Sequence, residues 1–161
     1  MNLCPFAAAE INQQRVRTVV CDARNEEALL GALQEEVLAL VETQTSETTL
    51  LVHPWVLQNF LDYNDFLGVC DQLLVDMNAE GKFQIASFHP QYQFAGTKID
   101  DAENFTNRSP YPLLHILRES SVSRAVDTHP DIDAVPQHNI ERLNELGASH
   151  LRGLWQRLTD D

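Results

Sequence analysis

The residues best suited to chemistry in this sequence are two histidines that each stand directly before a proline, His53-Pro54 and His89-Pro90. Each follows an apolar, β-branched or aromatic run that predicts a strand, and proline favours extended geometry in the residue before it and ends the strand's hydrogen bonding. Both imidazoles are therefore expected at the rim of a sheet, where open α/β folds bind their ligands. Because imidazole titrates near neutral pH, His89 is a candidate catalytic acid or base, and His53 would assist it.

Two questions about this histidine pair stay open. A ring at a strand end can instead bond to a backbone carbonyl, which would give it a structural role. The order of the strands also matters. If the strands before His53 and His89 are neighbours, the rings lie within reach of one another; if the strand predicted at residues 15–21 separates them, they cannot share a proton or a metal without help.

A second candidate site is a small anion site beside Ser109-Pro110, a dipeptide that is typical of a helix start. The free N–H groups of a first helical turn, together with the guanidinium of Arg108, would hold a carboxylate or a phosphate. In the alternative, Ser109 only caps its helix and Arg108 pairs with Asp101 or Glu119. The candidate anion-binding residues are Arg108, Ser109, Asn107, Tyr111 and Lys98.

Metal and cofactor chemistry have weaker support. Two imidazoles and a carboxylate suit non-haem iron or zinc, so His53, His89, Asp100 and Asp101 are weak metal candidates. The HxH, HxxxH and HExxH spacings are all missing. The sequence also lacks the GxSxG, GxGxxG and Walker lysine motifs, so it identifies no catalytic triad and no cofactor. The three cysteines form no CxxC pair, which favours reduced, buried thiols over a disulfide or zinc site.

The elements that position these residues follow from the hydrophobic pattern. Strands are predicted at residues 15–21, 48–53 and 83–89, and Asn25 is expected to cap the first of the two helices between them. A long polar stretch, residues 90–109, comes next, and loops of this length tend to be functional or disordered. A helix is predicted from Ser109 towards Val126. Asn139 is predicted to cap a last helix, which Gly147 either leaves continuous or breaks in two.

These elements predict an α/β fold, with a small, three-stranded, mainly parallel sheet in the order β-α-β-α-β along the chain, two further C-terminal helices, and helices on both faces. A chain of 161 residues fits a single globular domain over residues 1–161. Its net charge of −13 repels phosphate backbones and anionic lipids, so neither nucleic acid nor a membrane is an expected partner. The start lacks a basic region and no apolar run approaches about 20 residues, which favours a cytoplasmic protein.

Several stretches of the sequence resemble one known family, the bacterial and plastid proteins that share domain of unknown function 1415. The similarity is most specific at Ser87–Pro90 (SFHP) and Thr106–Pro112 (TNRSPYP), and it covers nearly the whole chain. The other similar stretches are LCPF at residues 3–6, residues 48–67, 83–93 and 104–119. The resemblance implies a single soluble domain, and it carries no assigned activity.

Two functions are compatible with these residues. The first is a small-molecule enzyme, a hydrolase or transferase acting on an anionic metabolite at a His and Arg site on the carboxyl-terminal rim of the sheet. The alternative is a non-catalytic module that binds a metabolite or a protein partner. A deep pocket holding both imidazoles and Arg108 would favour the enzyme, whereas histidines bonded to the backbone on a flat rim would favour the module.

Overall fold

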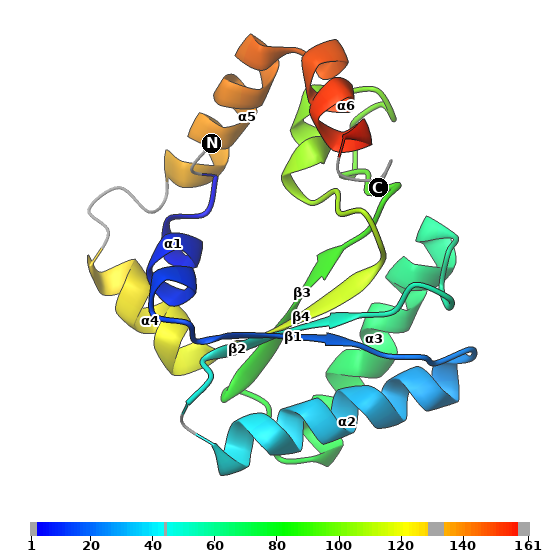
Figure 1. The fold of residues 1–161 in the computed structure, drawn as a ribbon, viewed down its shortest axis with the longest axis vertical. Helices are drawn as coiled ribbons and strands as arrows, with labels where there is room; N and C mark the ends of the chain where they lie inside the picture. Colours follow the sequence, from blue (N-terminus) through cyan, green and yellow to red (C-terminus); the bar gives the residue numbers. More distant parts are fainter. Residues whose placement is uncertain (1–2, 44, 129–133, 158–161) are drawn as a thin grey trace.

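The computed structural model describes residues 3–43, 45–128 and 134–157, and Figure 1 shows its fold. Four strands, six α-helices and one 3-10 helix are present within these residues. In chain order they are α1 (Pro5–Asn12), β1 (Val16–Val20), α2 (Glu26–Glu42), β2 (Thr48–Val52), α3 (Phe60–Asp76), β3 (Phe83–Phe88), the 3-10 helix η1 (Ala102–Thr106), β4 (Leu113–Arg118), α4 (Glu119–Thr128), α5 (Val135–Leu146) and α6 (Ala148–Gln156).

The strands form one mixed sheet in the order β1-β2-β4-β3. β1 and β2 are parallel neighbours, whereas β4 runs antiparallel to both β2 and β3. The α/β class and the three predicted strands are confirmed. The prediction of a three-stranded, mainly parallel sheet is wrong, because a fourth strand lies between β2 and β3 and runs antiparallel to both. Three α-helices, α4, α5 and α6, follow the sheet within the described residues, where two were predicted.

This fourth strand replaces the start of a predicted helix. Residues 113–118 form β4, and the helix that follows begins only at Glu119. Leu114 and Ile116 are fully buried, whereas Leu113, His115 and Leu117 are half-buried. The adjacent apolar residues of this run therefore belong to opposite faces of a covered strand. The same run also fits a helical pattern, which is why the prediction was wrong. Pro112 was an available signal against a helix, because proline disfavours the α conformation in the residue before it.

Helices α2 and α3 pack side by side against one face of the sheet (Figure 1). Asn25 caps α2 by accepting a hydrogen bond from the Ala28 N–H at 2.8 Å, as the sequence predicts. Asn59 caps α3 in the same way. The main core lies between these helices and the sheet, and its fully buried large side chains include Leu29, Leu33, Val37, Leu40, Leu51, Tyr63, Leu114 and Ile116.

The remaining helices lie on the other side of the sheet, where α5 and α6 pack on η1 and α1 packs on α4 (Figure 1). A second, smaller apolar cluster there is centred on Ala102, Leu143 and Leu151. Gly147, with φ +77°, divides α5 from α6, which is one of the two predicted outcomes. The predicted Asn139 cap is wrong, because α5 begins earlier and the Asn139 side chain donates to the Leu3 carbonyl at 2.7 Å. Within the described residues, no helix has the length and apolar character needed to cross a bilayer.

Candidate functional site

His53 and His89 occupy the predicted positions directly after β2 and β3, and both side chains are fully buried. Their backbone N–H groups continue the sheet pairing, since His53 donates to the Pro112 carbonyl and His89 to the Asn107 carbonyl. The chain that leads into β4 therefore runs between the two histidines. The open question of strand order is answered by β4, which separates β2 from β3.

Tyr63 of α3 connects the two imidazoles, and the sequence identified it only as part of an apolar stripe. Its ring centroid lies 5.8 Å from that of His53 and 5.1 Å from that of His89. Its hydroxyl donates to the Leu113 carbonyl at 2.8 Å and accepts from the Phe88 N–H at 3.0 Å. Burial raises the pKa of Tyr63 well above its usual value. The phenol therefore stays neutral and joins α3 to β3 and β4.

Both imidazoles donate to consecutive carbonyls of the loop between β2 and α3. His53 Nδ1 lies 3.1 Å from the Val56 carbonyl oxygen, and His89 Nε2 lies 3.2 Å from that of Leu57. A carbonyl only accepts, so these nitrogens carry the protons, and His89 Nδ1 accepts from the Gln91 N–H. The loop needs this support, because Leu57 has φ +56°, a left-handed conformation that is uncommon for a residue other than glycine.

The environment keeps both rings neutral. Burial lowers the pKa of His53 to about 4 and lowers that of His89, mainly because a charged imidazolium would lose its hydration. His53 Nε2 is buried and has no hydrogen-bond partner within the described part of the chain. Neither ring lines either of the pockets described below. A catalytic role for His53 and His89 stays a prediction, and it would require the 54–59 loop to move away from them.

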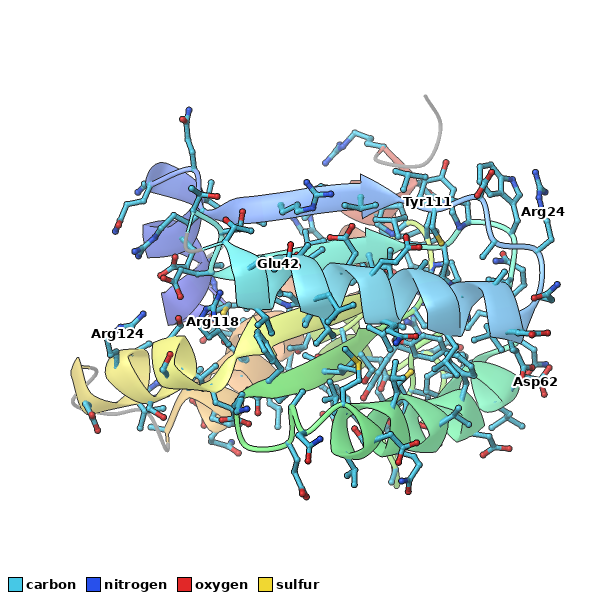
Figure 2. The ribbon with its side chains drawn as sticks, turned by 90° about the horizontal axis from the view of Figure 1, so that it is seen from below. Arg24, Glu42, Asp62, Tyr111, Arg118 and Arg124 are labelled. Carbon is cyan, nitrogen blue, oxygen red and sulfur yellow. The ribbon has the colours of Figure 1, made fainter. Side chains whose placement is uncertain are left out.

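An open hollow of about 880 Å³ lies between the 54–59 loop and the first turn of α2, beside the carboxyl ends of β1 and β2. It is lined by one guanidinium, Arg24, and by the carboxylates of Glu26, Glu27 and Asp62, together with neighbouring loop residues. Figure 2 shows Arg24 and Asp62 at the end of the molecule towards which β1 points. Arg24 also lies 4.3 Å above the ring of Trp55. The excess of carboxylates makes this hollow unsuitable for an anion.

The predicted anion site beside Ser109 lacks its structural basis, because no helix starts there. Ser109 is buried and its hydroxyl donates to the Tyr111 carbonyl at 2.6 Å instead of capping a helix. Asn107 donates its side-chain amide to the Ser87 carbonyl at 3.0 Å, while Tyr111 and Lys98 are exposed. The predicted helix-start donors are therefore absent, and of the five candidate residues only Arg108 lines a described pocket.

Arg108 is held within the long polar loop by the loop's own backbone. Its Nε donates to the Tyr92 carbonyl at 3.2 Å and its Nη2 to the Ile99 carbonyl at 2.6 Å. Its guanidinium also lies 4.6 Å above the centre of the Phe105 ring. Neither the predicted pairing with Asp101 nor that with Glu119 forms within the described residues. These contacts fix the position of one positive charge on the loop.

Arg108 lines a pocket of about 190 Å³ between the loop and α6. Its other lining residues are Pro90, Phe105, Arg152, Trp155 and Gln156, and we call it the Arg108 pocket. Arg152 pairs with Asp100 at 3.0 Å beside it. Burial lowers the pKa of Arg108, the nearby Asp100 opposes this shift, and the positive charge of Arg152 adds to it. The sequence did not single out Arg152, because only the packing of α6 on η1 brings it beside this loop.

The weak metal candidates are not gathered into one site. His53 and His89 are buried under the 54–59 loop, whereas Asp100 is exposed on the polar loop and Asp101 accepts from the Lys98 N–H at 2.8 Å. Within the described ranges, no group of three or more His, Cys, Asp or Glu residues is arranged to hold a metal ion. The expectation of buried cysteines holds for Cys70 only, since Cys4 is exposed directly before α1 and Cys21 is half-buried.

Comparison with known proteins gives a family and no activity. No curated protein and no solved structure matches the chain. The family model described as "Protein of unknown function (DUF1415)" matches residues 1–153. That match includes the histidine pair, the polar loop and Arg152. The chain belongs to the DUF1415 family, as the resemblance of its motifs indicated.

Proposed function

We propose that the protein is a binding module for a small anionic metabolite, which it holds in the Arg108 pocket. The observation that carries this proposal is the presence of two guanidiniums, Arg108 and Arg152, in the lining of one small pocket. On a chain with a net charge of −13, such a pocket selects a compact anion over a polyanion. Arginine suits this task because its planar fork of donors matches carboxylate and phosphate oxygens.

The position of Arg108 supports binding because the guanidinium is held in place before any ligand arrives. Two loop carbonyls and the Phe105 ring hold it, while its Nη1 makes no hydrogen bond within the described residues. A side chain that is already ordered loses little conformational entropy on binding, so more of the interaction energy appears as affinity. We assign to Arg108 Nη1 the hydrogen bond with the ligand.

The charges and the volume of the Arg108 pocket restrict the class of ligand that it can bind. Arg108 and Arg152 lie close enough for Arg152 to lower the pKa of Arg108. An anion between them would offset their mutual repulsion. At about 30 Å³ per water molecule, a pocket of about 190 Å³ corresponds to roughly six waters, which fits a phosphate or carboxylate group with a small apolar part. The ring of Phe105 and the neighbouring Pro90 supply apolar surface for that part.

Binding is better supported than catalysis because of where the histidines lie. Both imidazoles are fully buried and donate to carbonyls of the 54–59 loop, and neither lines the Arg108 pocket. An acid or base must reach the reacting group within hydrogen-bond distance. The Arg108 pocket offers guanidiniums, which do not exchange protons near neutral pH.

The proposal is tested by calorimetric titration with inorganic phosphate, phenyl phosphate and citrate at low ionic strength. Arg152→Gln removes a charge-assisted contact worth about 1.5 to 3 kcal/mol, so affinity for the ion that binds best should fall by roughly tenfold to a hundredfold. Asp100→Asn should act in the opposite direction. Asp100 competes with the ligand for Arg152 at 3.0 Å, so its neutralisation tightens binding.

Arg142→Gln is the matched control for these variants. Arg142 is an exposed arginine on α5 whose ion pair is with Glu145, so its loss should leave anion binding unchanged. Absence of saturable binding by all three anions would contradict the proposal. So would equal affinities in Arg152→Gln, Asp100→Asn and the wild type. Because the side chains of Arg152 and Asp100 are 46% and 82% exposed, the loss of their ion pair is not expected to unfold the protein.

A further inference from the structure

The two arginines that line the Arg108 pocket differ in their partners within the described residues. Arg152 forms an ion pair with Asp100 at 3.0 Å. Arg108 instead donates to the uncharged carbonyls of Tyr92 and Ile99. Burial lowers the pKa of Arg108 most, and Asp100 and Arg152 shift it further in opposite directions, so both charges act at this pocket. The two guanidiniums and the one carboxylate sum to a single positive charge.

A single positive charge favours a ligand with one negative charge. A monoanion neutralises it, whereas a dianion leaves an excess negative charge beside Asp100, on a chain whose net charge is already −13. At pH 7 a carboxylate carries one negative charge, and a phosphate monoester, whose second pKa is about 6, carries nearly two. Of the two groups that arginine recognises best, carboxylate is therefore the better match.

The rest of the lining restricts what the carboxylate is attached to. Phe105 and Pro90 of the polar loop and Trp155 of α6 place apolar surface on both sides of the pocket. An apolar cavity of about 150 Å³ holds benzene, so the volume of about 190 Å³ has room for one six-membered ring with a carboxylate. Aromatic rings attract one another beyond the area that they bury, which favours an aromatic ring over an aliphatic one.

We propose that the ligand of the Arg108 pocket is an aromatic monocarboxylate, a single ring that carries one carboxylate group. This inference rests on the proposed function, because it names the class of anion that the pocket holds. Arg108 Nη1 and Arg152 bind the carboxylate oxygens, and the ring lies against Phe105 and Trp155. Asp100 determines the specificity, since its negative charge weakens the binding of a dianion more than that of a monoanion.

Calorimetric titration of the wild-type protein with benzoate, phenyl phosphate and cyclohexanecarboxylate tests this proposal at pH 7 and low ionic strength. Benzoate should bind at least about threefold more tightly than phenyl phosphate, because only phenyl phosphate brings a second negative charge. It should also bind roughly twofold to tenfold more tightly than cyclohexanecarboxylate, because only benzoate has an aromatic ring.

Asp100→Asn tests the origin of the preference. The variant should bind phenyl phosphate more tightly by a larger factor than benzoate, so the ratio of the two affinities should change by at least about threefold towards phenyl phosphate. Asp65→Asn is the matched control, because it removes the same charge from an exposed position on α3, outside the pocket lining. It should leave the ratio unchanged.

Tryptophan fluorescence locates the bound ring. The chain has two tryptophans, of which Trp155 lines the pocket and Trp55 lies beneath the guanidinium of Arg24. In Trp55→Phe protein, benzoate should therefore change the fluorescence of Trp155, with the same Kd as in the titration.

The outcomes separate this inference from the proposed function. If anions bind but benzoate binds no more tightly than phenyl phosphate or cyclohexanecarboxylate, the aromatic monocarboxylate is overturned while anion binding in the pocket stands. An affinity ratio that Asp100→Asn leaves unchanged, or unchanged Trp155 fluorescence, would also overturn it. If none of the anions binds saturably, both the inference and the proposed function are wrong.

Discussion

The proton positions on three histidines follow from the atoms that their nitrogens face. His53 donates from Nδ1 to a carbonyl, while His89 and His115 donate from Nε2 to a carbonyl and a hydroxyl. The sequence places His53 and His89 at the rim of the sheet through the prolines that follow them. It does not predict their partners, because these depend on the path of the 54–59 loop and on the left-handed conformation of Leu57. No residue type at position 57 signals that conformation.

These neutral rings make stability depend on pH. The unfolded chain binds a proton at each ring near pH 6.5, whereas the folded protein does so only near pH 4 at His53 and His115. The unfolded state therefore binds more protons between these values. The contribution of these neutral rings to the free energy of unfolding is complete above about pH 6.5 and is lost as the pH falls towards 4. At about 1.4 kcal/mol per pKa unit, His53 alone accounts for a loss on the order of 3 kcal/mol.

Urea unfolding at pH 7, 6, 5 and 4 measures this dependence. His53→Gln should be less stable than the wild type at pH 7 but should lose less stability between pH 6.5 and 4. His138→Gln is the control, because that side chain is exposed and its removal should leave the pH dependence as it is. A free energy of unfolding that stays constant from pH 7 to 4 in the wild type would be incompatible with buried, neutral imidazoles.

At the level of elements, the sequence predicts a helix or a strand correctly where its hydrophobic pattern fits only one of the two. The β1, β2 and β3 strands and the helices α2 and α3 are confirmed, including the Asn25 cap. β4 was missed because a strand covered on both faces and a helix both allow adjacent apolar residues. The resulting error moved the anion site to a helix start that does not exist. The same error concerns His115, which falls within the predicted helix but lies on the central strand β4 in the structure.

Asn104 is a fully buried residue of η1 that connects three positions of the polar loop. Its side-chain oxygen accepts from the Phe94 N–H at 3.0 Å and the Thr97 hydroxyl at 2.9 Å, and its amide donates to the Lys98 carbonyl at 2.7 Å. Nothing in the composition of this stretch singles out Asn104. The sequence therefore predicts a loop that is either functional or disordered, and it does not show which residue orders it.

Asn104→Ala should loosen this loop without unfolding the sheet. Three hydrogen bonds made by this buried side chain are lost, at about 0.5 to 1.5 kcal/mol each, so the free energy of unfolding should fall by about 2 to 4 kcal/mol. Hydrogen exchange should accelerate at residues 93–106 and stay slow in β2 and β4. Asn64→Ala, on the exposed side of α3, should change stability by less than about 0.5 kcal/mol. Exchange that accelerates equally in the sheet would show that Asn104 does not act locally.

At the scale of the whole molecule, two electrostatic effects oppose each other. The net charge of −13 repels itself over the entire surface. Against this, Glu47 lies 3.5 Å from both Arg118 and Arg124 and 3.9 Å from Arg15, so it connects the residue before β1 with β4 and α4. Figure 2 shows Arg118 and Arg124 at the end of the molecule opposite to Arg24. The network is local, whereas the repulsion acts over long distances.

Salt weakens the long-range repulsion more than the ion pairs of Glu47, because screening increases with the distance between the charges. Between 0.01 M and 0.15 M salt the Debye length falls from about 30 Å to about 8 Å, which screens the long-range repulsion but affects partly buried pairs within 4 Å much less. Added NaCl should therefore stabilise the protein, and each gain of about 1 kcal/mol raises Tm by roughly 2 to 4 °C at this size. The measurement is Tm at both concentrations, at pH 7. A Tm that falls with salt would mean that the ion pairs outweigh the repulsion.

Anion binding in the Arg108 pocket would also raise Tm, so the two causes must be separated. General screening depends on ionic strength alone and should be the same in the wild type and in Arg152→Gln. Binding depends on the identity of the anion, because a ligand of the folded state stabilises it by mass action. Sodium phosphate should therefore raise Tm above the value in NaCl of equal ionic strength in the wild type. Arg152→Gln should lose most of that difference while it keeps the stabilisation by NaCl.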